Sequence, residues 1–477
     1  MTDACLSPSF LAPASHSRLR PFPRSLLLFT SFLHSPMRLL LLALLTLAPA
    51  LAAQAPSTLG LQRDPKIVAA LADVSPARLR ALDSVLVSFG TRHTMSDTVS
   101  NTRGVGAARR WIYGQLQQYS RDCGDCLKVE YDTGTAVITR HIERPRWPIV
   151  NVVAWLPGKD PNRVVVIGGH FDSCVCSSAN PMDAEGDAPG ADDDGSGTVA
   201  VMELARVVGK HFPQGLDATI AFVLYTGEEQ GLLGSTQFAE RLQREGKTVT
   251  AAFTDDIIGN VVADDGRVDS TSVRVFAVDS LAVGGGELAR YVWALGALYQ
   301  PDFEVLPVLR LDRLGRGGDH APFHRSGVPA LRFSERLENY KRQHLVTDVF
   351  EHVNFGYIAK VARLNLATVV SLAAAPSRPV RTAYSRDRES GGQSFNIRWD
   401  TVPGVVAYEL LVRRTTAPTY TRIVPTGNVT TFLLDEQLDD VWVGVRAVGP
   451  NGHRSLTTVV GAPNGPRLPN PPRRPQP

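Results

Sequence analysis

Short apolar runs alternate with amphipathic stretches between residues 76 and 374 of this chain. Four runs rich in β-branched residues predict strands at 149–155, 164–167, 218–224 and 273–278. Stretches with apolar residues at helical spacing predict helices at 76–90, 105–119, 197–208, 235–245, 286–298 and 354–374. Buried strands that alternate with helices indicate an α/β fold, in which helices sandwich a mixed, largely parallel sheet.

The pattern changes after Pro379. Short strands are predicted at 394–399, 405–413, 430–434 and 440–448, and Pro-Gly, Gly-Asn and Asn-Gly between them are turn signals. Trp399 and Tyr408 stand where a small β-sandwich places core aromatic residues. We therefore predict an all-β domain at 377–463, followed by a disordered Pro/Arg-rich tail at 464–477.

The first 52 residues have the features of a leader that is removed after export. A basic start at Met37-Arg38, an apolar stretch at 39–47 and Ala50-Leu51-Ala52 form a secretory signal. The apolar stretch is too short to span a membrane, and translation begins either at Met1 or at Met37. Residues 53–80 follow as a linker or pro-segment. The mature chain is therefore expected to be secreted or periplasmic.

Charge and cysteine content agree with export of an ordinary globular protein. The leader carries four arginines and Asp3, a net charge of +3, which is also the net charge of all 477 residues. The mature chain is thus near neutral, without the basic field that attracts nucleic acid or anionic membranes. Cys123, Cys126, Cys174 and Cys176 remain after the leader. Their even number favours disulfides, with three connectivities open, over a structural zinc site, because an oxidising compartment would oxidise the thiols.

Acidic residues and histidines follow the predicted strands, where open α/β sheets place their sites. Gly-Gly-His-Phe-Asp ends one strand, so Asp172 can accept from the ring of His170 and fix its tautomer. After another strand, the adjacent Glu228 and Glu229 point in different directions, so one can bind a metal while the other faces water. Asp256 enters an apolar run and needs a partner if it is buried.

Two further motifs complete a candidate ligand set. Gly-Ala-Asp-Asp-Asp-Gly-Ser-Gly contains three adjacent aspartates, one of which can bridge two ions through its two oxygens, and Gly-Gly-Asp-His places His320 at the start of a helical turn. His324 and His344 are expected to be surface or supporting residues. The predicted ligands are His170, Asp193, Glu229, Asp256 and His320. Two histidines and three carboxylates suit two zinc ions, with cobalt or manganese as substitutes.

In this fixed order the motifs GGHFDS, PGADDDGSG, LYTGEEQGLLGS, DDIIG and GGDHAPF closely resemble the M28 family of zinc aminopeptidases. The resemblance covers about residues 80 to 373, and we assign 81–375 to an M28-like domain. It implies that Asp193 bridges two zinc ions, that Glu229 and His320 complete one site, and that His170 and Asp256 complete the other. It also implies that Glu228 is the general base, that Asp172 orients His170, and that a cis peptide joins Asp193 to Asp194.

This chain departs from the family pattern at three places near the site. Asp192 stands where the family often has Asn, and Asp256 is followed by Ile257 where Met is common. The inserted Cys174-Val175-Cys176 follows the first motif directly. The C-terminal domain at 377–463 resembles a fibronectin type III domain, which could contact a surface or polymer or act as a spacer.

The expected function is that of a secreted di-zinc aminopeptidase, which acts on peptides with a free N-terminus by a metal-activated water. Glutaminyl cyclases resemble the family but use one zinc ion, and a carboxypeptidase would anchor a C-terminal carboxylate instead. A non-catalytic binding ectodomain would have lost ligands, and none is missing here.

Overall fold

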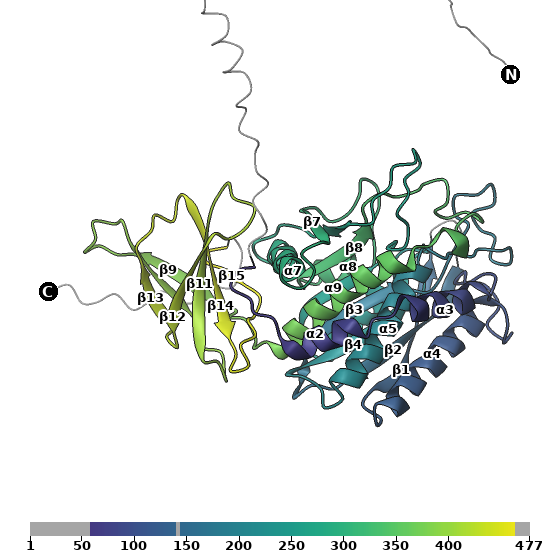
Figure 1. The fold of residues 1–477 in the computed structure, drawn as a ribbon, viewed down its shortest axis with the longest axis horizontal. Helices are drawn as coiled ribbons and strands as arrows, with labels where there is room; N and C mark the ends of the chain where they lie inside the picture. The colour runs from purple at the N-terminus through teal and green to yellow at the C-terminus, as the bar shows by residue number, and fades with distance from the viewer. Residues whose placement is uncertain (1–57, 140–143, 463–477) are drawn as a thin grey trace, which may run out of the picture. The chain divides into compact units, whose positions relative to one another are not determined.

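The computed structural model describes residues 58–139 and 144–462 (Figure 1). The predicted leader at 1–52, the first residues of the 53–80 segment and the tail at 464–477 lie outside the described residues.

One mixed sheet forms the centre of the larger domain. In the described ranges its eight strands have the order β1-β2-β4-β3-β5-β8-β6-β7. The strands are β1 Lys128–Ile138, β2 Arg144–Leu156, β3 Asp160–His170, β4 Ala218–Tyr225, β5 Thr248–Asp255, β6 Ser272–Phe276, β7 Glu304–Val308 and β8 Ala330–Glu335. The central strands β4, β3, β5 and β8 are parallel to one another, as are β6 and β7. Antiparallel pairs are formed by β1 with β2, by β2 with β4 and by β6 with β8. The predicted mixed, largely parallel sheet is confirmed.

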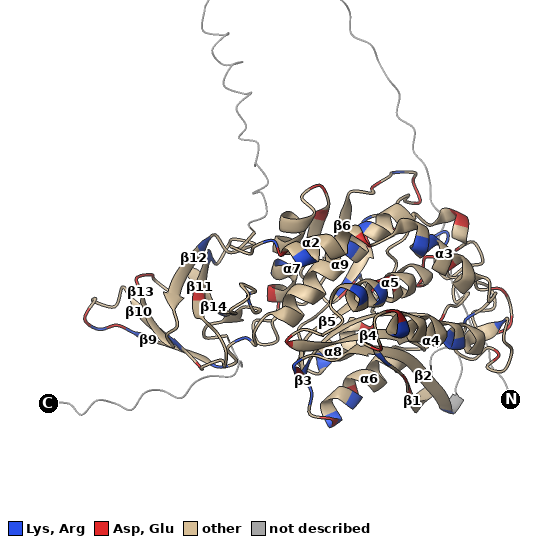
Figure 2. Ribbon diagram, turned by 60° about the horizontal axis from the view of Figure 1, so that its bottom comes forward, with Lys and Arg blue, Asp and Glu red and all other residues tan. Residues whose placement is uncertain are grey.

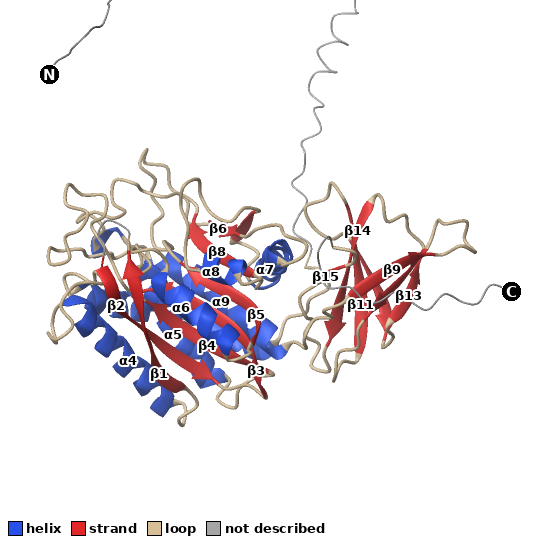
Figure 3. Cartoon of the chain, turned by 180° about the vertical axis from the view of Figure 1, so that it is seen from behind, coloured by secondary structure: helices blue, strands red, loops and turns tan. Residues whose placement is uncertain are grey.

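Helices cover both faces of this sheet (Figures 1 and 3). They are α2 Pro65–Ala72, α3 Pro76–Val87, α4 Gly104–Asp122, α5 Gly195–His211, α6 Leu233–Arg244, α7 Gly285–Tyr299, α8 His320–Arg325 and α9 Phe355–Ala374, with a short 3-10 turn, η1, at Phe350–His352. Along β3, Val165 and Ile167 join a core with α3, α4, α5, α7 and α9, whereas Val164 and Val166 join a separate core with α6 and α8. Because successive strand residues face opposite sides, burial on both sides explains the continuous apolar runs.

Helix α9 passes through the main core. By length and composition it is the one helix in 58–139 and 144–462 that could cross a membrane, but 89% of its apolar window is buried inside the protein. Its side chains pack against α2, α3, α5 and α7. Helix α9 is therefore apolar because it is buried in the core of the domain.

The C-terminal domain is all-β, as predicted. Its strands are β9 Thr382–Arg386, β10 Phe395–Trp399, β11 Ala407–Arg414, β12 Arg422–Gly427, β13 Thr431–Leu434, β14 Val441–Val448 and β15 Thr458–Val459. They form antiparallel sheets in the orders β13-β10-β9 and β12-β11-β14-β15. Trp399 and Tyr408 are buried in its core with ring centroids 5.6 Å apart, and the Tyr408 hydroxyl accepts the Val402 N–H at 2.7 Å.

Basic and acidic residues are interspersed along the described chain (Figure 2). Many form local pairs, such as Lys159 with Asp217 at 2.8 Å and Arg241 with Glu245 at 2.8 Å. Exposed pairs of this kind contribute about 0–1 kcal/mol each, and their mixing agrees with the near-neutral charge expected of the mature chain.

Candidate metal centre

Three parallel strands deliver the candidate ligands to one edge of the sheet. Strand β3 ends at His170, the loop after β4 carries Glu228 and Glu229, and Asp256 follows β5 directly. In the register of the sheet, His170 lies opposite Tyr225, the last residue of β4. Since β3 is paired with both β4 and β5, the residues after these strands gather at the same edge.

The first candidate ion site is formed by His170, Asp193 and Asp256, which are all buried. His170 Nε2 lies 3.4 Å from Asp193 Oδ1 and 3.9 Å from Asp256 Oδ1. The other ring nitrogen, Nδ1, donates to the main-chain carbonyl of Asp172 at 3.1 Å, which leaves Nε2 free to face the two carboxylates.

The second candidate site is formed by Asp193, Glu229 and His344. His344 Nε2 lies 3.0 Å from Asp193 Oδ2 and 3.3 Å from Glu229 Oε2. Asp193 therefore offers one oxygen to each group, as a bridging carboxylate would. Glu229 Oε1 is buried and accepts no hydrogen bond from the described residues. Such an oxygen fits a metal ion, because buried acceptors normally have a partner.

The structure does not bring His320 into either group, so the sequence-based ligand set needs a correction. His320 begins α8 and is fully buried, with its Nε2 2.6 Å from the main-chain oxygen of Leu311. Helix α8 contacts α6, β5 and β8 and contributes to the core on that face of the sheet. His344, which we expected to be a surface or supporting residue, takes the position assigned to His320.

Asp172 supports the site in a different way from the one expected. Its carboxylate lies 3.7 Å from His170 Nδ1, farther than its own main-chain carbonyl. Instead, the carboxylate accepts the N–H groups of Glu228 at 3.3 Å and Glu229 at 3.2 Å, and the Thr94 hydroxyl at 3.2 Å. Asp172 thus orients His170 through its backbone and holds the two-glutamate loop through its side chain.

Hydrogen bonds hold the loop that carries Asp193 in place on both sides of this residue. A cis peptide joins Asp193 to Asp194, as the family resemblance implies. Asp194 accepts the N–H groups of His170 at 3.0 Å and Gly197 at 2.8 Å, and so links the end of β3 to the start of α5. Asp348, which the sequence did not single out, accepts the Asp193 N–H at 2.9 Å.

Burial and mutual repulsion perturb the acidic side chains of the site. Burial raises the pKa of Glu228 to about 7 and that of Glu229 to about 8. The Glu229 carboxylate is the largest cause that raises the pKa of His344, to about 9. Burial also opposes ionisation of Asp256, but Arg332 and His170 lower its pKa below the usual value. Several ionised carboxylates buried this close together destabilise the folded protein in the absence of a cation. Divalent ions would relieve the repulsion between them.

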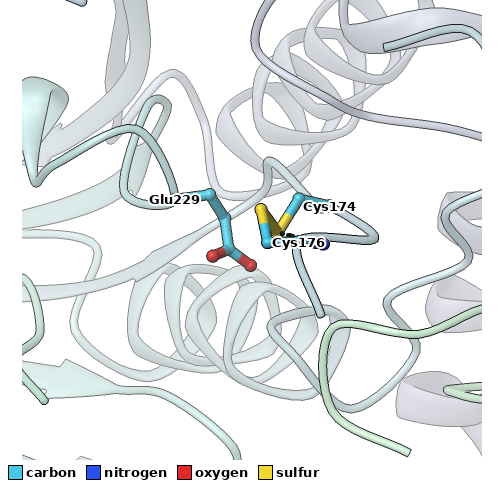
Figure 4. Close-up of side chains that lie close together, drawn as sticks. All are labelled: Cys174, Cys176 and Glu229. Atoms are coloured by element: carbon cyan, nitrogen blue, oxygen red, sulfur yellow. Dashed lines mark hydrogen bonds between the residues drawn. A yellow bond between two sulfur atoms is a disulfide. The ribbon is translucent and has the colours of Figure 1, made fainter. Parts of the chain in front are cut away.

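The inserted Cys174 and Cys176 lie beside Glu229 and are joined by a disulfide (Figure 4). Their sulfur atoms are close enough to the glutamate to form a third metal-like group, but disulfide sulfurs are not the thiolates that bind zinc. Cys123 and Cys126 form a separate disulfide after α4. The structure therefore pairs the cysteines within each motif, in place of a shared four-cysteine zinc site.

A cavity of about 460 Å³ opens over both ligand groups. Asp193, Glu228, Glu229, Asp256 and His344 line one part of it. The remainder of the lining comes from Leu232, Arg332 and a glycine-rich segment, Arg313, Gly315, Arg316 and Gly317. A peptide end that enters this cavity meets the candidate metal sites and Glu228 together.

Comparisons with known proteins identify the family and the fold. Residues 151–369 match the profile of peptidase family M28. The chain is 37% identical over 441 residues to a probable zinc metalloprotease of Pyrenophora teres f. teres, covering 85% of this chain and 89% of that protein. It is 38% identical over 432 residues to a probable zinc metalloprotease of Pyricularia oryzae, covering 83% and 84%. The LapA aminopeptidase of Legionella pneumophila shares the fold, with a TM-score of 0.52 and 22% identity over 66% of this chain and 76% of that chain.

Proposed function

The chain belongs to peptidase family M28 and to a group of zinc metalloproteases within it, and from this premise we propose that it is a di-zinc aminopeptidase. The observation that carries the proposal is the pair of ligand groups that share Asp193. His170 and Asp256 would hold one ion with Asp193, and Glu229 and His344 would hold the other. Preference for a free N-terminus is the finer part of the proposal, supported by the family resemblance and by the description of LapA as an aminopeptidase.

The residues around the two groups suit hydrolysis of a peptide bond. When bound, the zinc ions activate a water molecule and polarise the scissile carbonyl. Glu228 lines the same cavity, belongs to neither ligand group and has a pKa raised by burial to about 7. We assign it as the general base, because a group with this pKa can accept a proton near neutral pH and return it to the leaving amine. Asp172 positions Glu228 through the main-chain N–H.

We further propose that the chain is secreted or periplasmic, after cleavage near Ala52. The two disulfides support an oxidising compartment, in which such bonds persist. The division into an M28-like domain at 81–375 and a fibronectin type III-like domain at 377–463 is part of the same proposal.

The test combines metal content with product analysis. We expect about two zinc ions per chain by elemental analysis, cleavage of aminoacyl anilides with a free amine but not of their N-acetylated forms, and loss of both after chelation. Restoration by zinc completes the expected result. One ion with formation of a cyclised N-terminal product would favour a glutaminyl cyclase, and release of C-terminal residues would favour a carboxypeptidase. Either result, or no cleavage by protein that holds two ions, would contradict the proposal.

A further inference from the structure

Three arginines line the cavity beside the candidate metal sites, and two of them are already paired with carboxylates. Arg332 is buried and lies 2.8 Å from Asp256 and 3.2 Å from Asp312. Arg313 lies 3.1 Å from Asp312 and also forms an ion pair with Glu338. These two guanidinium groups are therefore neutralised within the protein.

Arg316 differs from both. Within the described ranges it forms no ion pair with a carboxylate, and its hydrogen bond, from Nη1 to the side-chain oxygen of Gln343, is long at 3.4 Å. The neighbouring Gly315 and Gly317 line the same cavity, and a Cβ atom added at either would meet no heavy atom within 4 Å. The wall around Arg316 is therefore open, and a ligand can approach its guanidinium group.

The charge balance of the cavity also points to Arg316. Asp193, Glu228, Glu229 and Asp256 carry four negative charges when they are ionised, which two divalent ions would balance. Asp312 and Glu338 are shared by Arg313, Arg332 and Arg274. No carboxylate of this set is left to pair with Arg316, which forms no ion pair among the described residues.

A second cavity, of about 480 Å³, continues from the same arginines. Arg313 and Arg316 line both cavities, and the second one adds Arg274, Arg310 and the apolar side chains of Phe276 and Tyr340. Arg274 pairs with Glu338, whereas Arg310 is exposed and has no ion pair among the described residues. The positive lining thus extends outward from the site, which favours approach of acidic peptides.

We propose that Arg316 binds a carboxylate of the peptide substrate and makes this chain selective for acidic peptides. The inference rests on the proposed function, since it names the substrate class of the same cavity. Guanidinium groups bind carboxylates through two parallel hydrogen bonds, which gives both affinity and orientation. The carboxylate can come from an N-terminal Asp or Glu side chain or from the C-terminus of a short peptide.

The experiment compares matched substrates that differ by one charge. Glutamyl and glutaminyl anilides test whether the bound carboxylate belongs to the N-terminal side chain. A dipeptide with a free or an amidated C-terminus tests whether it belongs to the C-terminus. We expect at least one charged member to have a kcat/KM about tenfold above its neutral partner. Arg316→Gln should abolish that ratio. Arg325→Gln, at an exposed position outside both cavities, is the control and should retain the ratio.

A binding measurement separates this inference from the proposed function. If the side-chain carboxylate is the source, L-glutamate should raise the melting temperature of zinc-loaded wild-type protein more than L-glutamine does. If the C-terminal carboxylate is the source, both should raise it equally. In either case Arg316→Gln should remove the effect. Chelator-sensitive cleavage of neutral substrates without any charge preference would overturn the carboxylate site while the aminopeptidase proposal stands. Stabilisation by glutamate through Arg316 in a protein that cleaves nothing would support the carboxylate site and refute the aminopeptidase proposal.

Discussion

The carboxylate of Asp348 accepts the main-chain N–H of Asp193 at 2.9 Å. The same carboxylate accepts the N–H of Asp192 at 3.0 Å. His344 lies four residues earlier in the same loop, with its Nε2 3.0 Å from the Asp193 carboxylate. One segment after β8 therefore holds both the backbone and the side chain of the residue that the two ligand groups share.

This relationship makes Asp348 a positioning residue for metal binding. We expect Asp348→Asn to weaken zinc binding about 10–100-fold, as loss of supporting contacts does at other metal sites. The cause is that an amide offers one acceptor oxygen where the carboxylate offers two. Competition with a chromogenic chelator measures the affinity. Asp302→Asn, at an exposed position, is the matched control, and an unchanged affinity for Asp348→Asn would show that other contacts hold the loop.

Substitution of the two histidines distinguishes the site in the structure from the one predicted from the sequence. His344→Ala should lower the zinc content from about two ions to about one per chain, because it removes a ligand from the group with Glu229. His320→Ala should retain both ions but lower the free energy of unfolding by about 1–3 kcal/mol, since the fully buried imidazole and its hydrogen bond to the carbonyl of Leu311 are lost. Elemental analysis and denaturant unfolding provide the two measurements. Zinc loss in His320→Ala alone would restore the original assignment.

The role of Glu228 predicts both a variant and a pH profile. Glu228→Gln should keep both zinc ions and reduce kcat by about 10²–10⁴-fold, because the amide cannot accept a proton. In the wild type the base must be ionised, so kcat/KM should rise with pH through the pKa of Glu228. Burial places this pKa at about 7, and bound zinc lowers it, so the acid limb should lie at or below neutral pH. Retained turnover in Glu228→Gln would exclude this assignment.

Metal-free protein should lose stability as the pH rises from about 4.5 to 9, first through Glu229 and then also through His344. Burial raises the folded-state pKa of Glu229 from 4.5 to about 8, and the Glu229 carboxylate raises that of His344 from 6.5 to about 9. A raised folded-state pKa stabilises the protein below the unfolded value, and this contribution is lost as the pH passes the folded value. Bound zinc takes the place of the protons on Glu229 and His344, so the free energy of unfolding of zinc-loaded protein should vary less over this pH range. Denaturant unfolding at several pH values tests this, and parallel curves with and without zinc would contradict it.

The ends of several strands could be predicted from the sequence because the apolar run of a buried strand is a local feature of the chain. Continuous apolar runs identified β2, β3 and β4, so His170 and Glu229 could be placed after strands from the sequence alone. Strand β5 was not predicted, and Asp256 was expected only to enter an apolar run. Strand β1 was missed because it lies at the edge of the sheet and is largely exposed, which removes the apolar run. Its sequence, KVEYDTGTAVI, carries polar residues through most of its length.

His344 was missed for a different reason. It follows no strand directly and sits in a polar loop with a positive φ of 57°, so neither periodicity nor a strand end marks it. Its proximity to Asp193 and Glu229 depends on how the loop after β8 folds back over the sheet edge, a long-range property that spacing does not contain. The acidic side chain four residues later, Asp348, was the available signal, since it is the residue that ties this loop to Asp193.

The disulfide between Cys174 and Cys176 has a consequence for the maturation of this protein. In the reduced chain the same sulfur atoms would be thiols beside Glu229, and we expect such soft ligands to compete for zinc. Oxidation removes that competitor and leaves the carboxylate for the group with Asp193 and His344. Metal loading should therefore follow disulfide formation, and chain produced in a reducing cytoplasm should trap zinc in the wrong place.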